Sequence, residues 1–291
     1  MKKLLFVLLF SFFLNPNTIA QSNYPPKISS DKTIIFKKTE TVDLKLWVFN
    51  PKQATGKDPA IVFFFGGGWH AGTPAQFIEQ AKFLSSRGMV SIIADYRVFS
   101  RDKIRAKFCI SDAKSAIRWV RKNAKNLGID ENKIVSSGGS AGGHLAAATG
   151  TVPYFDEEFE DQSISSKPNA MILFNPGLIT SSIDGFPIND EKLKNMRIRI
   201  GDDPIKASPY HYINKNTVPT IIFHGLNDKT IPYQTVELYD KKMKELGNIS
   251  ELHLYEGEDH GFFNYGRNSN IAFDDTMDKT YRFLQKIKFL E

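Results

Sequence analysis

Short apolar runs alternate with helical segments along most of the chain, and this alternation constrains the fold more than any other feature. Five runs combine an apolar stretch with glycine or polar residues at its end: PAIVFFFGGG, MVSIIADYR, KIVSSGGS, NAMILFNPG and PTIIFHGLND. Continuous apolar runs of this length predict strands that are buried on both faces. Because parallel strands need a crossover connection, we predict an α/β fold, with a mostly parallel sheet and helices on both faces.

Three further segments complete the predicted sheet. TIIFKKT at 33–39 and TVDLKLWVFNP at 41–51 predict an antiparallel hairpin, and SELHLYEG at 250–257 predicts a last strand, which gives eight strands. The predicted helices fall at 74–88, 104–127, 141–149, 232–247 and 269–289. The segment 176–217 interrupts this rhythm with several Pro, Asp and Asn residues, and it indicates a short cap-like insertion. We therefore predict a single domain over residues 21–291.

The first twenty residues have the layout of a secretory signal peptide. A basic start at Lys2 and Lys3 precedes an apolar run at 4–14, and Ala20 stands before the expected cleavage at Gln21. The apolar run is shorter than the roughly 20 residues that a spanning helix needs, so no stable membrane anchor is predicted. We expect an exported bacterial protein, either periplasmic or secreted.

Charge and cysteine content exclude several classes of function. The formal net charge is +6, but the lysines are scattered, whereas a nucleic-acid-binding protein gathers its basic side chains on one face. A nucleic-acid partner is therefore not expected. The one cysteine, Cys109, excludes an internal disulfide framework and a cysteine-based zinc site, and its helical context favours a buried apolar role. These features leave the oligomeric state open.

The segment Gly138-Gly139-Ser140-Ala141-Gly142 fits the G-x-S-x-G pattern between a predicted strand and a predicted helix. A serine at such a sharp turn is held with its hydroxyl above the sheet, and the flanking positions must lack bulk. Ser140 is therefore the predicted nucleophile. A phosphate-binding glycine loop is the alternative for a strand-to-helix turn, but neither G-x-x-x-x-G-K-[ST] nor G-x-G-x-x-G is present where such a loop would need it.

A serine nucleophile needs a base and an acid that orients the base. Asp228 follows one predicted strand and His260 follows the next, in the order Ser, Asp, His that the pattern requires. The other acids and imidazoles that could fill these roles are expected to have structural functions. Asp259 is expected to point away from its neighbour His260, His224 to pack within a strand, His144 to brace the serine turn, and Asp112 to serve as a helix cap or surface pair.

The glycines at 66–68 end the first predicted parallel strand. Glycines let backbone N–H groups approach a substrate carbonyl without interference from a Cβ atom. The helix that begins at Ala141 also presents free N–H groups and the positive end of its dipole. We predict an oxyanion hole made by the N–H groups of Gly67, Gly68 and Ala141; a tight turn with only a structural role is the alternative for the glycines.

With these residues identified, the chain resembles an α/β-hydrolase of the hormone-sensitive-lipase-like esterase group, and it is similar to bacterial acetyl-xylan and feruloyl carbohydrate esterases. The segments that carry the resemblance are FGGGW, ADYR, SDAKSAIRWVRKNA, GIDENKI, GGSAGGHLAA, PTIIFHGLNDKTIPY and DHGFF, which extend over the whole predicted domain. The resemblance implies a cofactor-free and metal-free serine esterase with Ser140, Asp228 and His260 as its triad. One position departs from the pattern: Phe65 stands where the family usually has a histidine that steadies the oxyanion loop.

The substrate is predicted more coarsely than the chemistry. Trp69 beside the glycines, Phe262 beside His260 and His211 in the insertion are the expected substrate-binding residues, although core packing is an alternative for Phe262. The short insertion and the expected export favour a small-molecule or oligosaccharide ester, with removal of acetyl or other small acyl groups from carbohydrate as the leading function. A prolyl-oligopeptidase-like serine peptidase and a non-catalytic binding protein on the same fold are the alternatives.

Overall fold

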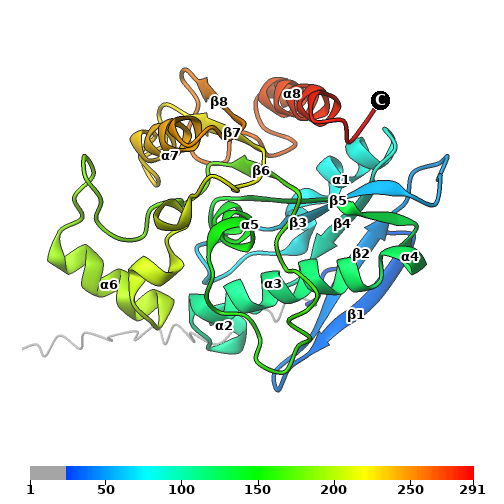
Figure 1. Ribbon diagram of the computed structural model, residues 1–291, viewed down its shortest axis with the longest axis horizontal. Helices are drawn as coiled ribbons and strands as arrows, with labels where there is room; N and C mark the ends of the chain where they lie inside the picture. The colour runs from blue at the N-terminus through cyan, green and yellow to red at the C-terminus, as the bar shows by residue number, and fades with distance from the viewer. Residues whose placement is uncertain (1–23) are drawn as a thin grey trace, which may run out of the picture.

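The computed structural model describes residues 24–291, so the predicted signal peptide lies outside the described residues. These residues form one eight-stranded sheet in the order β1-β2-β4-β3-β5-β6-β7-β8 (Figure 1). The strands are β1 Lys32–Lys38, β2 Asp43–Phe49, β3 Asp58–Phe64, β4 Val90–Ala94, β5 Ile129–Gly139, β6 Ala170–Phe174, β7 Thr220–Gly225 and β8 Ser250–Tyr255. β2 pairs antiparallel with both of its neighbours and the other pairs are parallel. The predicted mostly parallel sheet is confirmed.

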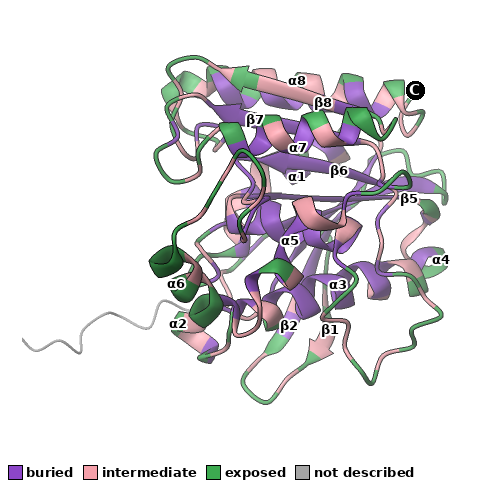
Figure 2. Cartoon of the chain, turned by 60° about the vertical axis from the view of Figure 1, so that its left-hand side comes forward, coloured by how far each residue is buried: buried purple, intermediate pink, exposed green. Residues whose placement is uncertain are grey.

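Helices cover both faces of this sheet, as the alternation predicted (Figures 1 and 2). Helices α3 Ala106–Lys122, α5 Ala141–Thr151 and α7 Gln234–Glu245 pack on one face, and α1 Ile78–Ser85 and α8 Ile271–Lys286 pack on the other. The short elements are η1 Pro74–Phe77, α2 Phe99–Asp102, α4 Ala124–Leu127 and η4 Asn268–Asn270. Each parallel strand therefore returns through a helix, which brings all the carboxyl ends of the parallel strands to the same edge.

The central strands are buried on both faces, and their side chains divide between two cores. In β3, Val62 and Phe64 join the core beneath α3 and α5, while Ile61 and Phe63 join the core beneath α1 and α8. Successive residues of a strand point to opposite faces, so an uninterrupted apolar run fills both cores at once. Cys109 is fully buried in the first of these cores, in agreement with an apolar role.

The insertion at 176–217 contains a helix that the sequence analysis did not predict, α6 Asp190–Ile200, followed by η2 Pro204–Ala207 and η3 Pro209–Tyr212. Most of α6 is exposed, so its apolar residues have no helical periodicity (Figure 2). Its two ends carry capping residues that are typical of helix termini. The side chain of Asn189 accepts the N–H of Lys192 at 2.9 Å, and Gly201 ends the helix in the left-handed region.

Two other boundaries differ from the prediction. The expected single helix at 104–127 divides at Asn123, which has a non-helical ψ of 15° and whose side-chain amide donates to the carbonyl of Trp119. β5 begins at Ile129, earlier than the predicted strand KIVSSGGS, because Asp58 pairs with Ile129 and the register then shifts so that Ala60 pairs with Ile134. Neither difference moves the carboxyl edge of the sheet.

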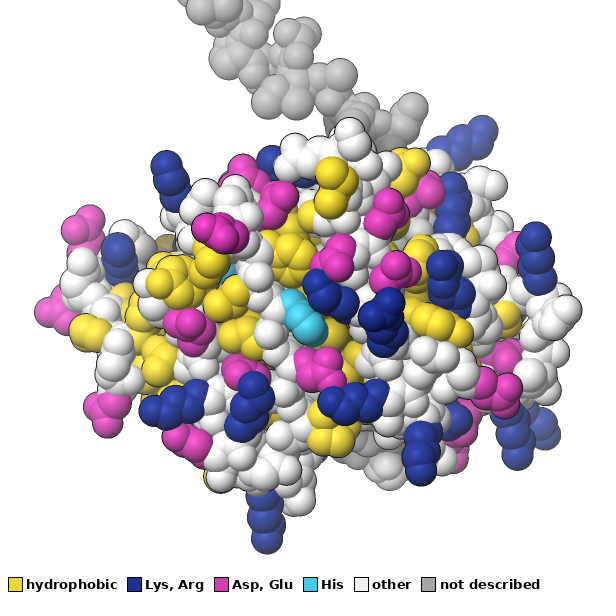
Figure 3. Space-filling view, turned by 90° about the horizontal axis from the view of Figure 1, so that it is seen from above, with side chains coloured by type: hydrophobic (Ala, Val, Ile, Leu, Met, Phe, Trp, Pro, Cys, Tyr) yellow, Lys and Arg dark blue, Asp and Glu magenta, His cyan; other side chains and the backbone are white. Residues whose placement is uncertain are grey.

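Over the face formed by β8 and α8, basic side chains are interspersed with acidic ones rather than gathered in a patch (Figure 3). Several of them are paired, such as Lys279 with Asp275 and Lys286 with Glu251. Among residues 24–291, no helix combines the length and the apolar content that crossing a bilayer requires.

Candidate active site

Ser140 occupies the turn between β5 and α5, with φ 55° and ψ −119°. A non-glycine residue in this region is strained, and its surroundings must hold it there. The N–H of Ser140 donates to the carbonyl of Phe174 on β6 at 2.8 Å, and its own carbonyl accepts the N–H of His144 at 2.9 Å. These bonds anchor the turn from both sides, so the Ser140 hydroxyl projects from a fixed backbone.

The glycines of the turn are required by close packing. A Cβ atom on Gly142 would lie 2.0 Å from the carbonyl oxygen of Phe64, and one on Gly138 would lie 2.4 Å from the carbonyl oxygen of Gly142. Backbone atoms of neighbouring elements cannot give way as the end of a flexible side chain can. The G-x-S-x-G spacing therefore reflects the close approach of β3, β5 and α5 beneath the serine.

We expect Gly142→Ala to lower the free energy of unfolding by about 3 kcal/mol or more, because the overlap lies with backbone rather than with a side chain. Gly177→Ala is the matched control, since its nearest neighbour would be Ile231 Cδ1 at 3.8 Å. Urea unfolding of the two variants measures the difference. Equal stabilities for both alanine variants would contradict the steric explanation.

Ser140, His260 and Asp228 form a continuous hydrogen-bonded series. The Nε2 atom of His260 lies 2.8 Å from Ser140 Oγ, and its Nδ1 atom lies 2.7 Å from Asp228 Oδ2. The three residues follow β5, β8 and β7 respectively, at the shared carboxyl edge of the sheet. The structure thus brings together the three side chains that the sequence pattern selected.

The carboxylate of Asp228 is almost completely enclosed and fully hydrogen-bonded. Its Oδ1 atom accepts the N–H groups of Thr230 and Ile231 at 2.8 and 2.9 Å, and its Oδ2 atom accepts the amide of Asn175 at 2.8 Å in addition to His260. Burial opposes ionisation, but the hydrogen bonds from His260 and the backbone outweigh it and hold the Asp228 pKa below its ordinary value. Asp228 therefore remains an anion that accepts the Nδ1 proton of His260.

Asn175 was missed by the sequence analysis. It follows β6, is fully buried, and has a positive φ of 42°. Its amide connects Asp228 to the N–H of Gly261, which lies 3.4 Å from Asn175 Oδ1. The signal available in the sequence was the position of this asparagine immediately after a buried strand, at the same edge as the other site residues.

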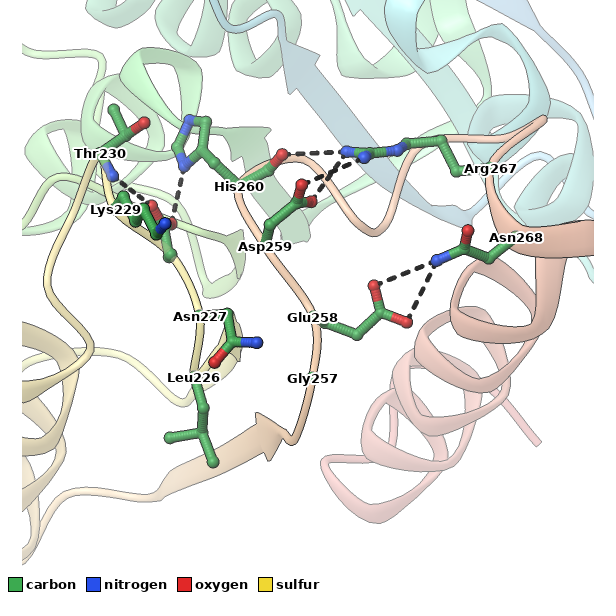
Figure 4. Close-up of a pocket in the computed structure, with 11 residues that line it drawn as sticks. Leu226, Asn227, Lys229, Thr230, Gly257, Glu258, Asp259, His260, Arg267 and Asn268 are labelled. Carbon is green, nitrogen blue, oxygen red and sulfur yellow. Dashed lines mark hydrogen bonds and ion pairs between the residues drawn. The ribbon is translucent and has the colours of Figure 1, made fainter.

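The competing acids and imidazoles have other partners. Asp259 turns away from the His260 ring and pairs with Arg267 at 3.1 Å (Figure 4). His224 is buried, and its Nε2 atom lies 2.9 Å from the carbonyl of Ile231 and 3.4 Å from Asp228 Oδ2. Asp112 is fully buried and paired with Arg97 and Lys37, both at 2.8 Å, so the expected cap or surface pair is wrong: α3 faces the sheet at this position and the carboxylate needs buried cations.

Gly67 and Gly68 adopt φ values of 126° and 64°, which favour glycine. A Cβ on Gly67 would lie 2.0 Å from the carbonyl oxygen of Ala71, so the loop closes tightly on itself. Among the described residues, the N–H groups of Gly67, Gly68 and Ala141 have no protein acceptor, which leaves them available to a ligand oxygen. Gly68 and Ala141 line the same cavity as Ser140.

Phe65 supports this loop by packing. Its ring stacks on Tyr96 with 4.1 Å between centroids, and the Tyr96 hydroxyl donates to the Phe65 carbonyl at 2.7 Å. The ring of His70, which belongs to the same loop, stacks on Phe99 with 5.3 Å between centroids.

A cavity of about 210 Å³ opens beside Ser140. Its walls are mainly apolar, and the insertion supplies much of them: the apolar lining residues are Trp69, Leu178, Ile179, Phe186, Met196, Ile231 and Pro232. Arg199 of α6 closes the cavity at the oxyanion loop, where it donates to the Gly68 carbonyl at 2.9 Å and lies over the Trp69 ring. Through this contact α6 of the insertion lies beside the oxyanion loop.

Two of the three predicted substrate-binding residues lie elsewhere. Phe262 is 1% exposed and packs against Tyr255 and Phe263 in the core beneath α8, because the chain after β8 turns this ring inward. His211 is half-buried beside Tyr210 in η3 and does not line the cavity at Ser140. Trp69 does line that cavity.

His144 connects α5 to the insertion. It is fully buried, and its ring Nε2 atom lies 2.7 Å from the carbonyl of Ala207. Its ring also packs edge-to-face with the Trp69 ring. Nε2 must carry the proton that it donates to this carbonyl. Burial lowers the His144 pKa from 6.5 to about 4, so the neutral ring is the stable form.

The low His144 pKa predicts a loss of stability in acid. Between the unfolded pKa of 6.5 and the folded pKa of about 4, the unfolded chain binds a proton that the folded chain excludes. We expect this group alone to cost about 3 kcal/mol across that interval. Relative to wild type, His144→Gln should therefore gain stability as the pH falls from 6.5 to 4, as measured by urea unfolding at each pH. A stability difference that does not change with pH would contradict the assignment.

Within residues 24–291, no three His, Cys, Asp or Glu side chains are grouped in a way that could hold a metal ion.

Two protein-family models match this chain. The BD-FAE family model matches residues 46–243, and the dienelactone hydrolase family model matches residues 204–288. The chain is similar to a solved thermophilic esterase of Thermogutta terrifontis, with 48% sequence identity and a TM-score of 0.88 over 92% of this chain and 96% of that one. Structures of that esterase with propionate bound and phosphonylated by sarin match with TM-scores of 0.87 and 0.88.

More distant relatives are also esterases. A probable isoprenylcysteine α-carbonyl methylesterase of Arabidopsis thaliana is 28% identical over 230 residues, which are 74% of this chain and 48% of that protein. An acetylxylan esterase of Xylanibacter ruminicola is 27% identical over 221 residues, 74% of this chain and 42% of that protein. This chain spans about half the length of these curated relatives.

Proposed function

The chain belongs to the BD-FAE family, and from this premise we propose that it is a serine carboxylesterase that removes acetyl or other short acyl groups from carbohydrate. The observation that carries the proposal is the unbroken hydrogen-bonded series from Ser140 through His260 to Asp228, which opens onto a small apolar cavity.

In the first half of the reaction, Ser140 Oγ attacks the ester carbonyl while His260 Nε2 takes its proton. Asp228 holds Nδ1–H and stabilises the imidazolium that forms. The carbonyl oxygen becomes an oxyanion, which accepts the N–H groups of Gly67, Gly68 and Ala141. When the tetrahedral intermediate collapses, His260 protonates the departing alcohol and the acyl group stays on Ser140.

In the second half, a water molecule replaces the alcohol. His260 takes a proton from the water, which attacks the acyl carbonyl, and the same N–H groups stabilise the second oxyanion. Collapse then releases the carboxylic acid and returns the proton to Ser140. The catalytic groups end in their starting protonation states, so the cycle needs no further co-reactant.

The size of the cavity supports a short acyl group. Its volume of about 210 Å³ and its apolar walls suit a few methylene groups, each of which contributes about 0.8 kcal/mol when buried. Phe186 and Met196 of the insertion line it, together with Arg199. A long acyl chain would have to displace these side chains.

Two features support carbohydrate as the alcohol. The similarity to an acetylxylan esterase provides a precedent within the relatives. The surface beside His260 is also polar: an open depression of about 980 Å³ is lined by Asn227, Lys229, Glu258, Arg267 and Asn268, whose side chains can bond to hydroxyl groups (Figure 4).

We further propose export through the signal peptide predicted at 1–20. Sequencing the N-terminus of the protein recovered outside the cytoplasm tests this proposal.

A substrate series tests this function. With p-nitrophenyl esters, kcat/KM should be highest for acetate to butyrate and should fall for longer acyl chains. Acetylated xylo-oligosaccharide should release acetate, and the Ser140→Ala variant should release none. A preference for feruloyl esters, or for a peptide anilide over every ester, would replace the proposed substrate class. Absence of turnover on the whole series would support a binding protein.

A further inference from the structure

The reaction requires two loops to keep a fixed relation to each other. The oxyanion loop, residues 65–72, aims the N–H groups of Gly67 and Gly68, and the histidine loop, residues 256–264, aims the ring of His260. The two loops follow β3 and β8, which are separated in the sheet by three strands. Phe65 has no side-chain hydrogen-bonding atom with which to connect them.

Two carboxamide side chains bridge the gap. The N–H of Gly66 donates to Gln76 Oε1 at 2.6 Å, Gln76 Nε2 donates to Asn264 Oδ1 at 2.9 Å, and Asn264 Nδ2 donates to the carbonyl of Gly261 at 2.7 Å. Each amide accepts at its oxygen and donates from its nitrogen. Turning either amide by 180° would place two donors or two acceptors opposite each other, so the direction of the series is fixed. Gly261 directly follows His260.

The same series continues to the acid of the triad. The N–H of Gly261 faces Asn175 Oδ1 at 3.4 Å, and Asn175 Nδ2 donates to Asp228 Oδ2 at 2.8 Å. One run of amides thus connects the oxyanion loop, the histidine loop and Asp228. Hydrogen bonds in such a run polarise one another, which favours a single arrangement.

We propose that Gln76 and Asn264 are positioning residues that set the oxyanion loop relative to His260. This inference rests on the proposed esterase function. The other bonds to the oxyanion loop do not reach the histidine loop: Tyr96 donates to the Phe65 carbonyl, and the Gly67 carbonyl accepts the N–H of Ala71 at 3.1 Å. Loss of the bridge leaves each loop folded but free to shift against the other.

The expected effect follows from the geometry. A displacement of about 1 Å in a reacting group costs on the order of 10²-fold in rate, and loss of one oxyanion donor costs about 10²–10³-fold. We therefore expect Gln76→Met and Asn264→Leu each to lower kcat by about 10- to 100-fold with little change in KM. The double variant should lose no more than the worse single variant, because both residues belong to one connection.

Two variants separate positioning from general stabilisation. Gln76→Glu keeps the acceptor for Gly66 but cannot donate to Asn264, so it should lose as much activity as Gln76→Met. Gln80→Met is the matched control: the amide of Gln80 lies 3.4 Å from the carbonyl of Phe263 in the histidine loop but has no bond to the oxyanion loop. Its kcat should stay near wild type even if its melting temperature falls.

Kinetics with p-nitrophenyl acetate and thermal unfolding of the same samples decide the outcome. The inference is overturned if Gln76→Met or Gln76→Glu keeps wild-type kcat, if the two single losses multiply in the double variant, or if Gln80→Met loses as much activity. Wild-type turnover is measured first. An inactive wild type rejects the proposed function, whereas an active wild type with active variants rejects only the bridge.

Discussion

Replacing Ser140 with alanine is expected to lower kcat for p-nitrophenyl acetate by about 10⁶-fold, the loss seen when a serine protease with a Ser-His-Asp triad loses its nucleophile. The Ser140 hydroxyl is the atom that receives the acyl group, and His260 Nε2 lies 2.8 Å from it as the proton acceptor. Without that oxygen, only the oxyanion donors and substrate binding remain to assist direct attack by water, worth about 10³–10⁴-fold over the uncatalysed reaction.

Ser137→Ala provides the control for this result. Ser137 lies on β5, the strand that leads to Ser140; it is fully buried, and its hydroxyl has no hydrogen-bond partner among the described residues. Its removal should leave kcat close to wild type. Substantial hydrolysis by the Ser140 variant, after purification from a host that lacks the esterase background, would mean that another group carries the acyl transfer.

Asp228→Asn is expected to lower kcat by about 10⁴-fold while the protein stays folded. The cause is the tautomer of His260. The side-chain atom facing the N–H groups of Thr230 and Ile231 must be an acceptor, so the amide oxygen of the variant takes that place. Its NH₂ group then faces His260 Nδ1, which must become an acceptor, and the proton moves to Nε2. Nε2–H cannot take a proton from Ser140.

The neighbouring Asp259→Asn variant separates this cause from a general change in charge. Asp259 pairs with Arg267 and makes no contact with the His260 ring, so its variant should keep nearly full activity (Figure 4). Rates for both variants should be followed from pH 6 to 9. Equal losses in the two variants would show that the specific contact between Asp228 and His260 is not the source of the effect.

The elements that could be predicted from the sequence are those with a local or periodic signal. β3 and β4 are apolar runs that fill both cores, and their burial was readable from composition. Ser140 is marked by glycines that the close approach of β3 requires. Asp228 and His260 are each a short distance beyond a strand end. The predicted resemblance to α/β-hydrolase esterases is confirmed by the family match and the similarity to an esterase of known structure.

The features that escaped prediction depend on tertiary contacts. α6 lacks an apolar face because most of it is exposed, and only its end signals at Asn189 and Gly201 marked it. In the sequence, Asn175 resembles an ordinary turn residue, and only the position of β6 in the sheet brings its amide to Asp228. Phe262 is two residues from His260 in sequence, but its ring turns into the core. Closeness in sequence to a site residue was therefore a poor guide to substrate binding.

Trapping the acyl-enzyme tests the central claim most directly. The protein is mixed with p-nitrophenyl butyrate, quenched in acid during turnover and digested, and the peptides are analysed by mass spectrometry. The account predicts one butyryl group on the fragment that contains Ser140, and none on that fragment in the Ser140→Ala variant. A butyryl group carried by a different side chain, with Ser140 unmodified while product is released, would contradict it.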